Sequence, residues 1–244
     1  MNNSLKNVIN LIEVLLFPSY CEICSSFLES FEEKVICNEC WEKIIPYRGQ
    51  ICLKCGKAIK SSFYQPHYCQ HCLTNVPTFS LHRSFGKYEG VLKDIILLFK
   101  FKRKRVLGKK LGYLAYETLK ANPIFLKSEV IIPVPLYPKR EKERGFNQCE
   151  IIAIELEKLT NIRFLKNVLI KIKDTPPQSV LDFKKRKNNV KGAFYVKNSL
   201  HIYKKNVLLI DDVYTSGSTI MECSKILKKA GAKEIFVLTL AQTV

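Results

Sequence analysis

The chain has 244 residues, with 40 Lys and Arg against 22 Asp and Glu, which gives a formal net charge of +18. Its length allows one sizeable core plus a small additional unit. Residues 1–78 contain seven basic and seven acidic side chains, so the whole positive excess falls in residues 79–244. This asymmetry favours polyanionic partners for the second part, such as phosphates or nucleic acid, while a general need for solubility is the alternative.

The first apolar stretch, VINLIEVLLF at residues 8–17, is too short for a membrane span and is interrupted by Glu13. No small-residue cleavage site follows it, which argues against a signal peptide. We therefore expect a cytoplasmic protein without a transmembrane segment, with peripheral attachment to a membrane as the weaker alternative. Helical spacing of apolar residues predicts an amphipathic helix that packs against the following domain: Leu5, Val8, Ile9, Ile12, Leu15 and Leu16.

Eight of the ten cysteines form four CxxC pairs, separated by 12, 11 and 13 residues. Two thiolates at this spacing occupy one side of a metal ion, and two such pairs complete a tetrahedral zinc site. A secreted disulfide scaffold fits less well because no export signal precedes the pairs, and a redox motif needs fewer of them. The pattern predicts two structural zinc ions with these ligands: Cys21, Cys24, Cys37, Cys40, Cys52, Cys55, Cys69 and Cys72.

Two arrangements of these ligands are open. Sequential sites join the first pair to the second and the third to the fourth, whereas a cross-brace interleaves them, and shorter loops favour the sequential arrangement. His67 and His71 lie among the last ligands, but four complete pairs make them unnecessary, so we expect them at the surface or beside a site. Gly56 directly follows a pair, where a knuckle often needs an unusual backbone conformation.

Residues 73–79 read LTNVPTF and mark the expected boundary between a zinc module with its helix at 1–78 and a second domain at 79–244. A strand is predicted within SLHRSFGKYEG at residues 80–90, with a turn at its end. Helical periodicity then covers residues 91–119.

The run KFKRKRVLGKK at residues 100–110 interrupts this periodicity with seven basic residues in eleven. It fits contact with a nucleic-acid backbone, with Phe99 and Phe101 as stacking residues. It fits equally a role in neutralising a pyrophosphate, or a solvated linker whose phenylalanines lie in the core.

The second half of the chain predicts an α/β fold with a parallel sheet. Buried strands are expected at VIIPVP (130–135), VLLI (207–210) and EIFVLTLA (234–241), and helices at CEIIAIELEKL (149–159) and STIMECSKILKKA (218–230). Strand, helix and strand with short links form a right-handed parallel unit. Ligands of such sheets bind beyond the carboxyl ends of the strands.

The stretch VLLIDDVYTSGST (207–219) is the strongest functional signal in this half. Asp211 and Asp212 are expected at the carboxyl end of a strand, and Thr215 to Thr219 lead into a helix. Backbone N–H groups and the helix dipole of such a loop hold an anion without a lysine, while neighbouring carboxylates accept hydrogen bonds from sugar hydroxyls. The glycine patterns of Walker and dinucleotide loops are absent. A simple acidic N-cap explains one aspartate but not both with the loop.

The chain resembles the ComF/GntX family, in which a cysteine-rich module precedes a type I phosphoribosyltransferase domain. The segments that carry the resemblance are IPVPLYPKREKERGFNQ (132–148), TPPQSVLDFKKRKNNVKGAF (175–194) and VLLIDDVYTSGSTIMECSKILKKAGA (207–232). Ser216 and Ser218 stand where the family often has Thr and Ala, and both are small enough to leave the loop intact. The resemblance implies binding of phosphoribosyl pyrophosphate (PRPP) with Mg²⁺, which the PRPP itself largely holds.

The resemblance also implies roles for single residues. Asp211 and Asp212 are expected on the ribose hydroxyls, and Arg140 and Arg144 at the pyrophosphate, unless these arginines only form surface salt bridges with Glu141 and Glu143. Asn147 and Gln148 are expected to brace the same loop, and Gln178, Arg186 and Asn189 to belong to a mobile lid. The full set expected to contact PRPP is Asp211, Asp212, Val213, Tyr214, Thr215, Ser216, Gly217, Ser218, Thr219, Arg140 and Arg144.

Two functions follow as hypotheses. The first is a PRPP-dependent transferase in which Asp212 and Arg144 are catalytic, Asp212 as a proton acceptor, with an acceptor substrate that the sequence does not identify. The second is a competence factor that binds single-stranded DNA without catalysis and reuses the pocket for binding or sensing. The family implies a role in DNA uptake, with other competence proteins as partners. Cys149 and Cys223 are expected to be small buried residues on helices.

Overall fold

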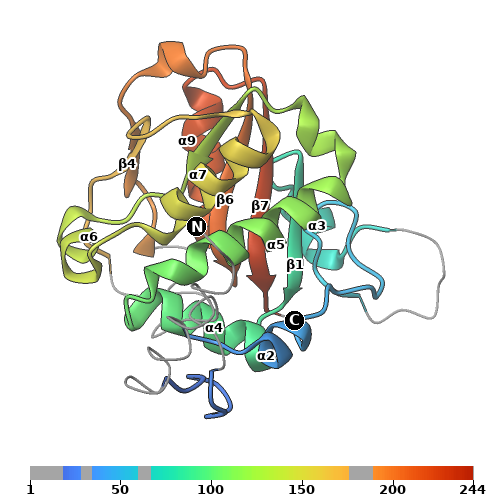
Figure 1. Cartoon of the computed structure of the whole chain (residues 1–244). Helices are drawn as coiled ribbons and strands as arrows, with labels where there is room; N and C mark the ends of the chain where they lie inside the picture. Colours follow the sequence, from blue (N-terminus) through green and yellow to red (C-terminus); the bar gives the residue numbers. More distant parts are fainter. Residues whose placement is uncertain (1–18, 29–34, 60–66, 176–188, 244) are drawn as a thin grey trace.

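A computed structural model describes residues 19–28, 35–59, 67–175 and 189–243. Its centre is a five-stranded parallel sheet, which confirms the expected α/β class (Figure 1). The strands lie in the order β1 (Leu81–Lys87), β7 (Glu234–Gln242), β6 (Asn206–Tyr214), β2 (Val130–Pro133) and β3 (Arg163–Phe164).

Helices cover both faces of this sheet. On one face lie α4 (Gly90–Phe101), α5 (Gly108–Lys120) and α7 (Gln148–Thr160), and on the other α9 (Ser218–Lys229) (Figure 1). The connection from β2 to β3 and that from β6 to β7 run in opposite directions across the sheet. Because both crossovers in such sheets are right-handed, their helices α7 and α9 fall on opposite faces. The direction reverses between β2 and β6, where a crevice opens at the carboxyl ends.

Shorter elements complete the domain. These are α6 (Pro138–Arg144), the antiparallel pair β4 (Leu169–Lys171) and β5 (Phe194–Val196), and the 3₁₀ turns η1 (Arg105–Leu107), η2 (Pro123–Lys127) and η4 (Ser199–His201). Pro at the first turn of α6 suits its start, and Gly145 ends this helix in the left-handed region at φ +85°. The Asn147 side chain caps α7 by accepting a hydrogen bond from the Cys149 N–H at 2.9 Å.

The strand β6 is longer than its apolar run predicts. Val207 to Ile210 are fully buried, as expected, but the strand continues to Tyr214. Asp211 and Asp212 therefore lie within the last residues of the strand, where Asp211 pairs with Thr239 of β7, and not in a loop beyond it. The ladder to β7 extends the strand because that neighbour is itself nine residues long.

The cysteine module is an internal repeat. Each half begins with an isolated antiparallel bridge, Tyr20 with Phe27 and Ile51 with Ala58, around its first CxxC pair. Each half ends in a one-turn helix that starts after a cysteine, α2 (Asn38–Glu42) and α3 (Gln70–Thr74). The residue after each first pair is left-handed, Ser25 at φ 61° and Gly56 at φ 65°, which confirms the expected unusual backbone at Gly56.

The two halves of the module pack on opposite sides of the sheet. Cys21, Cys37 and Cys40 share a hydrophobic core with α4 and α5, whereas Cys52, Cys55 and Cys72 share one with β6 and α9. The chain between the halves also runs along the outer edge of β1. There Tyr47 donates its N–H to the Phe85 carbonyl at 2.9 Å, and His82 donates to Lys54 at 2.9 Å.

The boundary at residue 78 stays a prediction, and the shared cores cross it. The predicted N-terminal helix and the lid residues Gln178 and Arg186 lie outside the described residues. Among the helices of the described ranges, none has the length and apolar character that a membrane crossing requires.

Candidate functional site

A cleft of about 400 Å³ opens at the carboxyl end of the sheet, where β2 and β6 are neighbours. Its walls come from several separate parts of the chain. Residues 134–136 follow β2, Arg140 and Arg144 come from α6, Lys100 and Phe101 end α4, and residues 211–215 and 217–220 come from β6 and the loop after it. Except for Ser216, the residues expected to contact PRPP thus line one cavity.

Asp212 is a buried carboxylate in the cleft with two side-chain partners. Its carboxylate is 4% exposed, pairs with Lys100 Nζ at 2.7 Å and accepts a hydrogen bond from Gln148 Nε2 at 2.6 Å. Arg144 in turn donates to the Gln148 side-chain oxygen. Burial opposes the charge on Lys100, but Asp212 outweighs it and raises the pKa of the lysine. The side chain of Asp212 is therefore held in place by two partners, Lys100 and Gln148.

Asp211 has other partners, although a carboxylate oxygen of each aspartate and the Cys149 sulfur all lie within 4.8 Å of one another. It accepts from its neighbour's N–H at 2.9 Å and lies 3.6 Å from the Cys149 thiol. Burial, and next the charge of Asp212, raise the pKa of Asp211 to about 7. Burial and the two aspartates raise the pKa of Cys149 well above its ordinary value. Cys149 is buried as predicted but contacts a carboxylate, which its place on the helix did not indicate.

The loop after β6 has the geometry of an anion site. Gly217 precedes α9 in the left-handed conformation at φ +74°, and this glycine lines the cleft together with the first residues of the helix. Ser216 and Ser218 exchange a hydrogen bond of 2.9 Å between their hydroxyls. Thr215, Ser216, Ser218 and Thr219 are all partly exposed, so their polar atoms are accessible to a ligand.

Arg140 and Arg144 of α6 both line the cleft. In the described part of the chain, neither forms the alternative surface salt bridge with Glu141 or Glu143. Arg140 pairs with Asp174 at 3.4 Å, and the Arg144 guanidinium lies 5.4 Å from the centre of the Phe101 ring. Burial lowers the pKa of Arg144, which remains a cation because its ordinary value is so high. Asn147 donates to the Val134 carbonyl at 3.1 Å and so ties α7 to the loop after β2, as expected of a bracing residue.

Sequence reasoning missed Lys100 as a member of this site. The residue was grouped with the basic run, yet its Nζ reaches Asp212 from the end of α4. A signal was present in the helical phase, because Lys100 follows the buried residues Leu92 and Ile96 at intervals of four. Tyr88 and Lys171 also line the cleft, and burial, then Arg140, lowers the pKa of Lys171.

The other residues of the basic run at 100–110, and Phe99 before it, do not all fit the same one of the alternatives given above. Phe99 is fully buried and packs on Phe146 with ring centres 5.3 Å apart, so its predicted stacking role is wrong. Phe101 is 65% exposed at the mouth of the cleft. Lys104 pairs with Glu22 of the cysteine module at 2.6 Å, and Lys110 lies 5.0 Å from the centre of the Trp41 ring.

The cysteines gather in two sets of four with sequential pairing, and the sulfurs of each set lie within 4.8 Å of one another. Sulfur separations are 3.8 Å for Cys21 and Cys40, 3.6 Å for Cys24 and Cys37, and 3.7 Å for Cys55 and Cys69. A tetrahedral ion with Zn–S bonds of about 2.3 Å requires about 3.8 Å between sulfurs. The two sets therefore fit zinc, and His67 and His71 belong to neither set.

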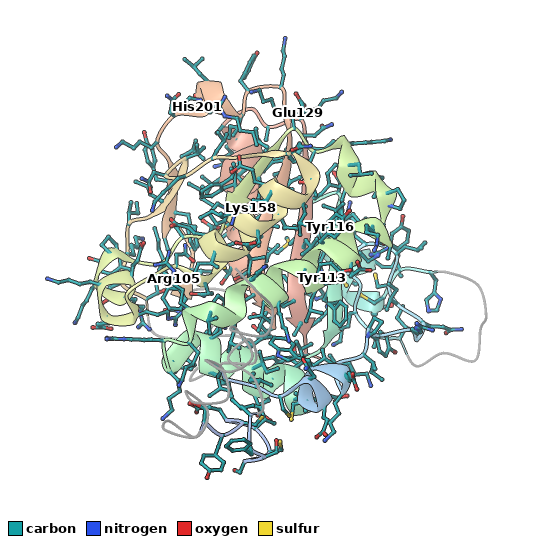
Figure 2. All side chains as sticks on the ribbon, viewed as in Figure 1. Arg105, Tyr113, Tyr116, Glu129, Lys158 and His201 are labelled. Carbon is teal, nitrogen blue, oxygen red and sulfur yellow. The ribbon has the colours of Figure 1, made fainter. Side chains whose placement is uncertain are left out.

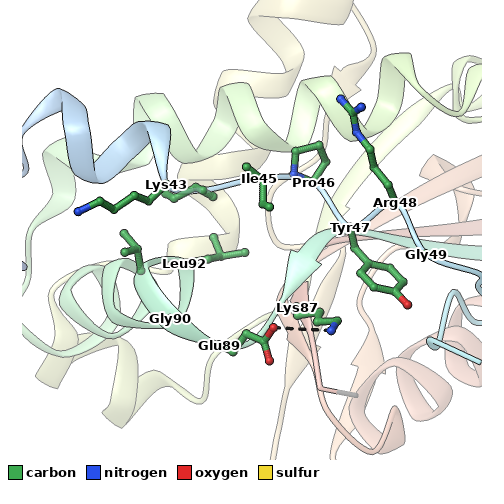
Figure 3. Close-up of a pocket in the computed structure, with 12 residues that line it drawn as sticks. Lys43, Ile45, Pro46, Tyr47, Arg48, Gly49, Lys87, Glu89, Gly90 and Leu92 are labelled. Carbon is green, nitrogen blue, oxygen red and sulfur yellow. Dashed lines mark ion pairs between the residues drawn. The ribbon is translucent and has the colours of Figure 1, made fainter. Parts of the chain in front are cut away.

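A second hollow, of about 620 Å³, lies on the other side of the end of β1 (Figure 3). Ile45, Pro46 and Leu92 contribute apolar walls, and Lys87 pairs with Glu89 at 3.7 Å across one side. It is larger than the first cleft but contains no paired carboxylates and no helix-capping loop of small hydroxyl residues. The chemistry therefore points to the smaller cleft.

Comparison with known proteins agrees with this organisation. Residues 12–73 match the family model of the double zinc ribbon domain. The chain is 35% identical to Competence protein F of Haemophilus influenzae over 213 residues, which cover 85% of this chain and 90% of that protein. This chain belongs to the competence protein F (ComF) family.

Other relatives of this ComF-family chain have similar coverage. Competence protein ComFC of Streptococcus pneumoniae is 29% identical over 86% of this chain and 89% of its own length. DNA utilization protein YhgH of Escherichia coli K12 is 27% identical over 94% of this chain and its entire length. A solved glutamine PRPP amidotransferase of B. subtilis overlaps 54% of this chain and 25% of that one at 21% identity, with a TM-score of only 0.36.

Proposed function

We propose that this ComF-family protein binds PRPP with Mg²⁺ in the cleft between β2 and β6, and that it acts in DNA uptake. The observation that carries the proposal is the pairing of two carboxylates with a helix-capping loop at one end of the sheet. The names of the relatives, competence and DNA utilization, support the process in which it takes part.

Each part of the cleft suits one part of this ligand. Carboxylates of Asp211 and Asp212 accept hydrogen bonds from ribose hydroxyls, and the loop from Thr215 to Thr219 holds the 5′-phosphate at the start of α9. Arg140 and Arg144 supply guanidinium groups for the pyrophosphate. Mg²⁺, which the PRPP largely holds, neutralises charge between the pyrophosphate and the sugar.

Lys100 adds a resident cation that PRPP does not bring. Its ammonium compensates one of the two aspartates at 2.7 Å, so the pair does not repel an anionic ligand with both charges. If a transfer takes place, leaving pyrophosphate develops charge next to Arg144, and this residue stabilises it. In such a transfer Asp212 is the proton acceptor that the resemblance implies, and Asp211, whose pKa burial raises to about 7, is a second candidate for this role.

The cysteine module is proposed to hold two structural zinc ions, one for each set of four cysteines: Cys21, Cys24, Cys37 and Cys40, then Cys52, Cys55, Cys69 and Cys72. Their sulfur spacing and the double zinc ribbon match support this. The ions would fix the knuckles and close both halves of the module, since such domains fold only with their metal.

Binding of single-stranded DNA is the second candidate function. Exposed Lys102, Arg103 and Arg105 lie beside Phe101, which is 65% exposed. Cations that follow a phosphate backbone next to an aromatic platform are the usual elements of such a surface. This surface adjoins the cleft without sharing its carboxylates, so one chain has room for both ligands.

Paired substitutions separate the two candidates. The double variant Asp211→Asn with Asp212→Asn is expected to abolish PRPP binding in calorimetric titration with Mg²⁺, while fluorescence polarisation with a single-stranded oligonucleotide stays unchanged. Replacing Lys102, Arg103, Lys104 and Arg105 with Gln is expected to do the reverse. Circular dichroism controls for folding, and release of pyrophosphate with a panel of nucleobases and DNA tests for transfer. A wild-type protein that binds no PRPP would contradict the proposal.

A further inference from the structure

A chain of buried contacts leads from the second cysteine set to the loop after β6. The carbonyl of Cys55 accepts hydrogen bonds from His82 Nδ1 at 2.7 Å and from Gln242 Nε2 at 3.2 Å. His82 is fully buried on β1, which is the strand next to the module. Because the buried His82 ring is hydrogen-bonded directly to the Cys55 carbonyl, its position depends on the position of this CxxC knuckle.

The hydrogen bonds of His82 fix its ring completely. A carbonyl only accepts, so Nδ1 must carry the proton, and Nε2 then accepts from the Thr239 hydroxyl at 2.9 Å. Both ring nitrogens are thereby satisfied inside the core. The ring cannot turn without breaking one of these bonds and leaving a buried polar atom unpaired.

The next contact is with Tyr214, the last residue of β6. The two rings stack with centres 4.3 Å apart and an angle of 20° between their planes. Phe79 holds the tyrosine from another side, edge-on, at 6.4 Å and 89°. Tyr214 is 7% exposed, so its ring is held inside the core by these two contacts.

Tyr214 finally supports the loop that follows it. The ring lies directly against Gly217, where a Cβ would come within 2.3 Å of the tyrosine oxygen. The Tyr214 carbonyl also accepts from the Thr243 N–H at 3.0 Å, which anchors the start of the loop. The position of this ring therefore determines where the Gly217 backbone can lie.

We propose that His82 and Tyr214 are positioning residues through which the second cysteine set holds the sugar-phosphate loop in its binding conformation. This inference rests on the proposed function, since it concerns the part of the protein that supports the PRPP site. The first set makes its contacts on the opposite face, with α4 and α5, and does not reach Tyr214 in the described part of the chain. Metal in one half of the module thus stabilises the phosphate loop.

The test uses the full-length protein with five substitutions. His82→Phe keeps a ring against Tyr214 but loses the bond to Cys55, and His82→Asn keeps a donor for Cys55 but loses the ring. Tyr214→Leu removes the ring under Gly217, and Tyr214→Phe retains it. His201→Phe is the matched control, because His201 is exposed at the end of the molecule far from the cleft residues (Figure 2). Zinc content, PRPP affinity with Mg²⁺, and amide exchange of residues 215–219 are measured for each variant.

We expect every variant to keep the zinc content of the wild type, since no cysteine is changed. His82→Phe and His82→Asn should each weaken PRPP binding about fivefold and Tyr214→Leu about tenfold, with faster exchange in residues 215–219. Tyr214→Phe, which retains the ring, should weaken binding less than Tyr214→Leu, and the control should bind within about twofold of the wild type. Wild-type affinity and exchange in both His82 variants would overturn the proposal.

A cycle with Cys72→Ser isolates the contribution of the metal set. This change should remove one zinc and weaken PRPP binding in the wild-type background, but weaken it much less once His82→Phe has cut the connection. Equal effects in both backgrounds would mean that the set acts by another route. If the wild type binds no PRPP, the proposed function fails, while faster exchange of 215–219 in His82→Phe still supports the coupling and wild-type exchange refutes it.

Discussion

The two halves of the cysteine module have nearly the same local structure and quite different surroundings. Both contain a bridge, a left-handed residue after the first pair and a one-turn helix. The first half packs on the face of α4 and α5 and pairs with Lys104 of the basic run. The second packs near β6 and bonds to His82. A repeated metal ribbon can thus serve two roles, because its role depends on what it packs against.

The cleft also has two sides, and each side packs near a different half of the cysteine module. Asp212, Lys100 and Gln148 belong to the side of α4 and α7, which the first half supports. Tyr214 and Gly217 belong to the side that the second half supports. We therefore expect the acidic part and the phosphate part of the site to depend on different halves of the module, and substitutions on either side should separate them.

Loss of one zinc ion should have the largest effect. Cys40→Ser and Cys72→Ser each leave one complete set, so elemental analysis should find one zinc per chain in place of two, and chelators should remove both. Structural zinc contributes on the order of 10 kcal/mol to folding of small domains, so both variants should show a large fall in the midpoint of thermal unfolding. Only Cys72→Ser should also increase amide exchange in residues 215–219. Equal exchange in the two variants would contradict the division.

Removing the cation on the acidic side should come next. Lys100→Met leaves Asp212 buried without its ion pair, and breaking such a pair costs about 3 kcal/mol or more. Chemical denaturation should detect this loss, and PRPP affinity should become more dependent on Mg²⁺ concentration. Lys102→Met is the matched control, because that side chain is exposed two residues further along. A stability equal to that of the control would show that the pair contributes nothing.

On the phosphate side, Gly217→Ala should be more harmful than an alanine at another left-handed glycine. Gly217 has φ +74° and the tyrosine ring against it, whereas Gly90 has φ +52° and open space around its Cα. Both changes cost about 1 kcal/mol for the backbone conformation, and Gly217→Ala adds a steric clash. Calorimetry should find PRPP binding weakened only by Gly217→Ala, while denaturation reports both losses.

The pH dependence of stability and of PRPP binding tests Asp211, whose carboxylate lies between the acidic part and the phosphate part of the cleft. Folding raises the pKa of Asp211 to about 7, so the native state holds a proton that the unfolded chain has already released. The contribution of this group to stability is full at low pH, and is lost as pH rises through about 7. PRPP binding should strengthen over the same interval, because ribose hydroxyls donate to the ionised form. Asp211→Asn should flatten both profiles, and an unchanged slope would assign them to another group.

The smallest effect is expected where the first half meets the basic run. Lys104 and Glu22 pair at 2.6 Å, but about a third of each side chain is exposed. Water screens such pairs, so Lys104→Ala should lower the free energy of unfolding by less than about 1 kcal/mol. Double-mutant cycles with Glu22→Ala measure the pair directly. A larger coupling would mean that this contact helps to hold the module in place.

Much of this architecture could be predicted from the sequence, because it depends on local periodicity. The four CxxC pairs at regular intervals predicted the two sets, and apolar runs at 130–135 and 207–210 predicted neighbouring buried strands. The motif at 207–219 predicted which loop begins α9. These features need only the spacing of residues that are close in the chain.

The features that were missed depend on residues far apart in the chain. Lys100 reaches Asp212 across more than a hundred residues, and His82 meets Tyr214 over a longer separation still. No local pattern encodes either contact, since both arise from how β1, α4 and β6 are arranged. The end of β6 was misjudged for the same reason, because pairing with β7 extended the strand past its apolar run.

The hydrogen bond that Tyr47 donates to β1 and the one that the Lys54 carbonyl accepts from it have a consequence for solubility. A parallel sheet that ended in an uncovered β1 would present unpaired N–H and C=O groups to any other chain, which is how sheets add strands and aggregate. The linker between the two ribbon halves covers this edge at Phe85, and the first knuckle of the second half covers it at His82. Loss of zinc would therefore be expected to expose this edge and favour self-association of the protein.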